Sequence, residues 1–130
     1  VVDALGITDE QLLEAERRAA TVLRSRAEIF RRARPRIPLT GRTVVIVDDG
    51  IATGATARAA CEVVRASGAT RVVVATPVAP AETVAELEDL ADEVVCLSTP
   101  HPFYAIGPFY EDFAQVDDDV VVALLDRAAT

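Results

Sequence analysis

The chain has 130 residues, of which 51% are hydrophobic, and this length predicts one domain, residues 1–130, with a buried core. No apolar run approaches the roughly 20 residues of a membrane span, and no signal peptide is recognised, so we expect a cytoplasmic protein without membrane contact. The net charge of −8 argues against nucleic acid as a partner, and the absence of lysine excludes a Schiff base or a Walker lysine within this chain.

Arginine is concentrated in one segment. Nine arginines fall within residues 17–42, where Glu28 is the only acid, so the rest of the chain is strongly acidic. Such a segment is typical of a solvated helix face, and it is also compatible with contact to a polyphosphate or a partner. Both interpretations stay open at this point.

The first element in chain order is a long helix. Thr8 and Gln11 have the spacing of a capping box, and apolar residues from Leu12 to Phe30 then recur at mostly helical spacing. We expect a helix over residues 9–33 that ends before Pro35, because proline donates no backbone hydrogen bond and does not fit a helix interior.

Strands and helices alternate after residue 42. Strands that are apolar throughout and separated by helices indicate a parallel sheet covered by helices on both faces, which is the α/β class. Only three strands are visible. The sequence predicts strands at 43–47, 71–76 and 93–97, helices at 56–67, 81–90 and 117–128, and a loop at 98–116.

The stretch VVIVDDGIATGAT, residues 44–56, carries the strongest functional signal. Asp48 and Asp49 follow the strand directly, and small residues with two threonines lead into the next helix. Unpaired amides and the dipole of a helix N-terminus favour a phosphate, which small side chains allow to approach closely. Carboxylates repel a phosphate at contact distance but accept hydrogen bonds from hydroxyl groups one sugar's length away. The pattern therefore predicts a site for a sugar phosphate.

This stretch resembles the phosphoribosyl-pyrophosphate (PRPP) loop of type I phosphoribosyltransferases. The wider chain, including LTGRTVVIVDDGIATGAT, ATPVAP and CLSTPHPFYAIGPFYEDFAQVDDDVV, is similar to a bacterial group of predicted phosphoribosyltransferases over nearly all of residues 5–128. The resemblance implies a type I phosphoribosyltransferase-like α/β fold and transfer of phosphoribosyl from PRPP, with Mg²⁺ carried by PRPP rather than by protein ligands. It also implies catalytic roles for Asp48 and Asp49, which would bind the ribose hydroxyls and stabilise a cationic transition state. The PRPP-binding residues that it implies are Asp48, Asp49, Gly50, Ala52, Thr53, Gly54, Ala55 and Thr56.

Aromatic residues cluster after the third predicted strand. Five of the six in the chain fall within residues 103–113. Members of the family often stack the nucleobase in this region, and bases do stack on aromatic faces, so Phe103 and Tyr104 are candidates for base binding. The alternative is a loop that its own aromatic residues pin to the core.

Other candidate sites are weaker. His101 follows Ser98 closely, but nothing presents a nucleophile elbow, and we interpret it as a solvated loop histidine. The acids 117–119 are explained by a helix N-terminus, so no protein metal site is predicted. Cys61 and Cys96 lie in apolar segments without metal-ligand spacing, and we interpret them as reduced core residues, although a disulfide between them stays open.

The chain departs from the family in its first part. Type I phosphoribosyltransferases place strands and a pyrophosphate-binding loop ahead of the PRPP loop, whereas the 43 residues before Val44 predict one helix and a proline-rich connection. We therefore expect the C-terminal part of a longer member, which forms a homo-oligomer or associates with the missing N-terminal segment. The partners implied are PRPP or ribose 5-phosphate and an unidentified nucleobase. The alternative function is a non-catalytic PRPP-binding regulatory or interaction module.

Overall fold

The computed structural model describes residues 8–33 and 36–128. The chain forms two compact units. One contains the helices α1 (Asp9–Ala33) and α4 (Asp118–Arg127), and the other is the α/β unit Ile37–Ala114. Across the described ranges, none of the helices has the length and apolar character to cross a bilayer.

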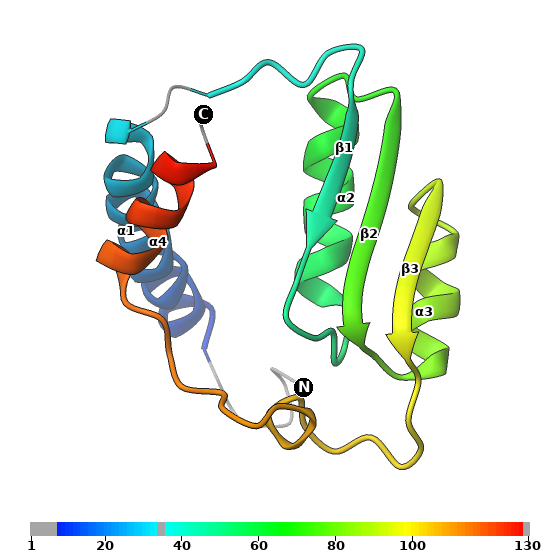
Figure 1. The fold of residues 1–130 in the computed structure, drawn as a ribbon. Helices are drawn as coiled ribbons and strands as arrows, with labels where there is room; N and C mark the ends of the chain where they lie inside the picture. Colours follow the sequence, from blue (N-terminus) through cyan, green and yellow to red (C-terminus); the bar gives the residue numbers. More distant parts are fainter. Residues whose placement is uncertain (1–7, 34–35, 129–130) are drawn as a thin grey trace. The chain divides into compact units, whose positions relative to one another are not determined.

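The helical unit confirms the sequence-based helix ends. The Thr8 amide donates to Gln11 Oε1 over 3.0 Å, and the Gln11 amide donates to the Thr8 hydroxyl over 3.3 Å, so the predicted capping box starts α1. α1 contacts α4 (Figure 1). The guanidinium of Arg26 lies 3.9 Å from the carboxylate of Asp118. Asp118 belongs to the first turn of α4, where acids complement the helix dipole as predicted.

The α/β unit contains a three-stranded parallel sheet in the order β1-β2-β3. The predicted class and the predicted strands are confirmed, although the third strand ends one residue later than predicted and the second strand ends two residues later. We expected the second strand to stop before Pro77, but it continues to Val78. Proline is tolerated there because pairing with β1 ends at Ala75, and the pairs with β3 fall on either side of Pro77. The elements are β1 (Thr43–Val47), α2 (Ala55–Ala66), β2 (Arg71–Val78), α3 (Ala81–Glu88), β3 (Glu93–Ser98) and a 3-10 helix at Gly107–Phe109.

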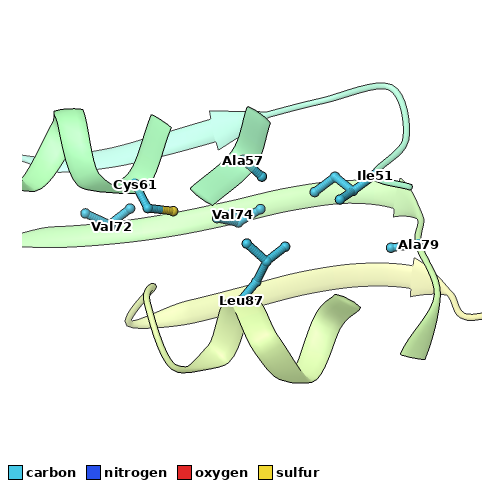
Figure 2. Packing of buried hydrophobic residues seen from close by; sticks show 7 residues of the cluster. All are labelled: Ile51, Ala57, Cys61, Val72, Val74, Ala79 and Leu87. Carbon is cyan, nitrogen blue, oxygen red and sulfur yellow. The ribbon is translucent and has the colours of Figure 1, made fainter. Parts of the chain in front are cut away.

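Both helices of this unit pack on the same face of the sheet. Their shared core also receives residues of β2 and of the loops that follow β1 and β2 (Figure 2). The strands lie in the sheet in their chain order, and right-handed crossovers in one direction place successive helices on one side. The core consists of Ile51, Ala57, Cys61, Val72, Val74, Ala79 and Leu87.

The other face of the sheet is apolar and exposed within the α/β unit. Val47 and Leu97, at the carboxyl ends of the outer strands, are 75% and 80% exposed, and Val45 and Val95 are exposed beside them. Helices were predicted on both faces, and within residues 37–114 they cover only one. Continuous apolar strands report burial but not the direction of the crossovers, so coverage of the second face stays a prediction.

Candidate functional site

The two acids lie where β1 ends. The amide of Asp48 donates to the carbonyl of Ala75 over 3.2 Å, which extends the contact with β2 by one residue. Asp48 is half-buried, and its Oδ1 accepts a hydrogen bond of 3.0 Å from the amide of Asp49. The carboxylate of Asp49 is exposed and makes no hydrogen bond or ion pair with the described residues. It is therefore available to a ligand.

The loop between β1 and α2 is held by hydrogen bonds to β2 and α3. The amide of Ile51 donates to the carbonyl of Val78 over 3.0 Å, and the Ile51 side chain is buried in the core. The hydroxyl of Thr83, in α3, donates to the carbonyl of Ala52 over 2.9 Å. The loop is thus attached to both β2 and α3, and its shape is set before any ligand arrives.

The amides of this loop are unpaired. Gly54 caps α2 with φ 73°, in the left-handed region that glycine adopts without strain, and no side chain caps the helix. In the part of the chain that the structure describes, the backbone amides of residues 52–57 donate no hydrogen bond. These groups and the dipole of α2 favour an anion.

A small pocket extends from Asp48 to these amides. Its volume is about 210 Å³, which is below the roughly 300–1,000 Å³ typical of pockets for whole small molecules. The size suits a phosphate group with part of a sugar. The lining residues are Asp48, Gly50, Ile51, Ala52, Thr53, Gly54, Ala55, Thr56, Ala57 and Ile106, which include every predicted PRPP-binding residue except Asp49.

Arg58 is the charged side chain in the first turn of α2. Its guanidinium forms an ion pair with Glu86 of α3. This partner offsets the positive charge close to the loop. Attraction of an anion to the loop therefore rests mainly on the unpaired amides and the helix dipole.

The aromatic segment lies against the acid pair through residues that the sequence did not single out. The hydroxyl of Tyr110 donates to the backbone carbonyl of Asp49 over 2.5 Å. A Cβ atom on Gly50 would lie 2.4 Å from Cγ2 of Ile106, so these two residues are packed tightly. Thr83 was also missed, because nothing in the local sequence of α3 distinguishes it from a core threonine.

The two predicted base-binding residues differ in their surroundings. The rings of Phe103 and Phe109 stack with centroids 5.8 Å apart, so one face of Phe103 is already occupied. Tyr104 is 88% exposed. The rings of Tyr110 and Phe113 form a second pair, with centroids 5.1 Å apart. These pairs agree with a loop that is pinned by its own aromatic residues. Base binding by Phe103 and Tyr104 stays a prediction.

The structure also describes the weaker candidates, namely the lone histidine, the two cysteines and the acid groups. His101 is exposed, and Cys61 and Cys96 are free thiols, which closes the question of a disulfide between them. Burial raises the pKa of the Cys61 thiol, as expected for a core residue. No group of three or more histidine, cysteine, aspartate or glutamate side chains within residues 8–33 and 36–128 is placed to hold a metal ion.

A family model for the phosphoribosyl transferase domain matches residues 8–114. The chain belongs to this family. The resemblance read from residues 44–56 is thereby confirmed, and the α/β fold agrees with it.

Three relatives extend this comparison. Two proteins of Mycobacterium tuberculosis are each 61% identical to this phosphoribosyl transferase domain over 113 residues, which is 87% of the chain and 26% of theirs. They are named "Putative phosphoribosyl transferase MT0597" (strain CDC 1551 / Oshkosh) and "Putative phosphoribosyl transferase Rv0571c" (strain ATCC 25618 / H37Rv). The crystal structure of TT1426 from Thermus thermophilus is 50% identical, with a TM-score of 0.79 over 95% of this chain and 60% of that one. The chain thus spans about a quarter of the length of the curated relatives.

Proposed function

We propose that residues 48–56 bind PRPP or ribose 5-phosphate, and that the domain transfers phosphoribosyl to a nitrogen base in the cytoplasm. One observation carries the proposal: among the described residues, the six amides of residues 52–57, in the loop and the first turn of α2, have no hydrogen-bond partner, and they follow a carboxylate pair with free acceptor capacity. The amides suit the 5-phosphate, and the carboxylates suit the ribose hydroxyls. In the transfer, a C–N bond to the base forms at the anomeric carbon and the C–O bond to pyrophosphate breaks.

The two acids contribute differently to this reaction. Asp48 has one oxygen committed to the amide of Asp49, so it presents a single free oxygen in a fixed direction. Asp49 presents its whole carboxylate. As the bond to pyrophosphate breaks, positive charge develops on the sugar ring, and two carboxylates held close to the ring stabilise that charge electrostatically.

Mg²⁺ belongs to the proposal as a companion of the substrate. Mg²⁺ binds readily to substrate phosphates and keeps several of its waters, so we propose that it is carried by the oxygens of PRPP and not by direct protein ligands. The ion would neutralise part of the pyrophosphate charge. The chain's own residues hold the phosphate, orient the sugar and supply negative charge beneath it.

The test is calorimetric titration of the chain with PRPP and Mg²⁺, followed by the variants Asp48→Asn and Asp49→Asn. An amide still accepts a hydroxyl hydrogen but loses the charge, so we expect binding to weaken by about fivefold per variant, as for about 1 kcal/mol. Pyrophosphate release with common purine and pyrimidine bases should fall much further, because the transition state carries the charge that the variants no longer stabilise.

Asp89→Asn is the matched control, since Asp89 is an exposed carboxylate at the end of α3 and far from the loop in sequence. It should leave binding and release unchanged. A wild-type chain that does not bind PRPP refutes the proposal. Binding without release for any base would show that this chain by itself acts as a PRPP-binding module.

A further inference from the structure

The backbone of Asp49 is held at both of its polar groups. Asp49 lies past the end of β1, so no strand pairing supports it. Its amide donates to Asp48 Oδ1 over 3.0 Å, and its carbonyl accepts the hydroxyl of Tyr110 over 2.5 Å. Within the described ranges these are the only hydrogen bonds of the Asp49 backbone. The second bond comes from a residue 61 positions away in the sequence.

The same distant segment also contacts the next residue. An added Cβ on Gly50 would meet Ile106 at 2.4 Å from Cγ2 and 2.8 Å from Cγ1. Among the described glycines, those in the left-handed region are Gly41, Gly54 and Gly68, so Gly50 is required for space and not for backbone conformation. Ile106 also lines the pocket. The segment 103–113 therefore contacts two consecutive residues of the motif.

We propose that Tyr110 is a positioning residue that fixes Asp49 for the sugar hydroxyls, with Ile106 packed on Gly50 as its second point of contact. This inference rests on the proposed function of the site. An exposed carboxylate on an unsupported turn would have to be ordered when the ligand binds, which weakens binding. A backbone fixed beforehand at its amide and its carbonyl avoids most of that loss. The segment then contributes to ribose recognition through Tyr110, independently of any base stacking by Phe103 or Tyr104.

The test separates recognition of the hydroxyls from recognition of the phosphate. Ribose 5-phosphate and tetrahydrofurfuryl phosphate both present a phosphate on a five-membered ring ether, but only the first carries ring hydroxyls. Tyr110→Phe removes one oxygen and leaves the ring in place. We expect it to weaken binding of ribose 5-phosphate by about three- to fivefold, the value of one ordinary hydrogen bond, and to leave tetrahydrofurfuryl phosphate unchanged.

Thr43→Val is the control that likewise removes one hydroxyl oxygen, because Thr43 is exposed at the start of β1, at the opposite end of the strand from the acids, and its hydroxyl makes no hydrogen bond with the described residues. It should alter neither affinity. Equal weakening of both probes by Tyr110→Phe would show that the hydroxyl only supports the fold of the loop, and would overturn the inference. An unchanged preference for ribose 5-phosphate would overturn it as well. If the wild-type chain shows no preference for ribose 5-phosphate, the proposed function fails together with the inference.

A second pair of variants tests the contact with Ile106. Gly50→Ala should weaken binding of ribose 5-phosphate, because the new methyl group displaces Ile106 and the segment with it. Gly50→Ala combined with Ile106→Ala removes the obstructing side chain and should restore most of the affinity. Failure of the double variant to recover, with far-UV circular dichroism unchanged, would refute the contribution of this contact.

Discussion

Gly54→Ala is predicted to damage the anion site for two separable structural reasons. The φ of Gly54 is 73°, and an alanine in the left-handed region costs about 1–2 kcal/mol. Its Cβ would also lie 3.0 Å from Cγ2 of Thr83, which is 5% exposed and has little room to move. Overpacking of a buried position costs about 1–3 kcal/mol. The two effects sum to about 2–5 kcal/mol, or about 1–4 kcal/mol in the free energy of unfolding after the lower entropy of the unfolded chain is allowed for.

Gly41 offers a matched control for the first effect. Its φ is 74°, and nothing lies within 4 Å of an added Cβ. It precedes β1, at the opposite end of the strand from the acids. Gly41→Ala should therefore show the backbone cost alone, about 1 kcal/mol after the lower entropy of the unfolded chain is allowed for. It should leave phosphate binding unchanged.

The assays are urea unfolding followed by circular dichroism and titration with inorganic phosphate. Thr83→Ser keeps the hydroxyl but lacks Cγ2, so in combination with Gly54→Ala it should relieve the steric part of the loss. The reasoning is wrong if Gly54→Ala is no more destabilising than Gly41→Ala, or if the two variants bind phosphate equally well.

Two further predictions concern single polar contacts. Thr83→Val keeps the shape of the side chain but leaves the carbonyl of Ala52 without its donor. Urea unfolding should then show a loss of about 1 kcal/mol in the free energy of unfolding, and phosphate binding should weaken. Thr83→Ser keeps the donor and should retain both the stability and the phosphate affinity. The hydrogen bond from the Val72 amide, helped by the Arg65 guanidinium, holds the pKa of Asp92 below its ordinary value of 3.8. The pKa of Asp92 is lower in the folded chain than in the unfolded chain. Its stabilising effect is therefore fully present at a pH above the unfolded-state pKa, and it is lost as the pH falls through the folded-state pKa. The difference in the free energy of unfolding between the wild-type chain and Asp92→Asn should therefore shrink as the pH falls below 3.8. A difference that stays constant as the pH falls would contradict the lowered pKa of Asp92.

Local signals predicted the elements of this fold well. The start of α1 depends on Thr8 and Gln11, three residues apart, and β1 is bounded by glycines on both sides, so both could be read from a short window. The end of β2 was wrong, because the effect of Pro77 depends on where the neighbouring strands stop pairing. The face that α2 and α3 share could not be predicted for a related reason, since it depends on the path of the chain through the sheet.

The candidate site divides in the same way. The acids and the glycine-containing turn are contiguous in sequence, so a sugar-phosphate site could be predicted from the sequence alone. Thr83 and Tyr110 act on that turn from 31 and 61 residues away, and neither has a neighbour that marks it. Contacts at such separations are decided by packing, which a single sequence does not report.

The exposed apolar face of the sheet has a practical consequence for work with this chain. Val47 and Leu97 are its most exposed residues, and either is a natural choice for a polar substitution that improves solubility. The two choices are not equivalent. Val47 is bonded directly to Asp48 and ends the strand from which the motif begins, so a change there also acts on the ligand site. Leu97 lies on β3, outside the motif and its pocket, and is 80% exposed, so it loses little burial when replaced. A polar substitution at Leu97 should therefore raise solubility without changing the positions of Asp48 and Asp49.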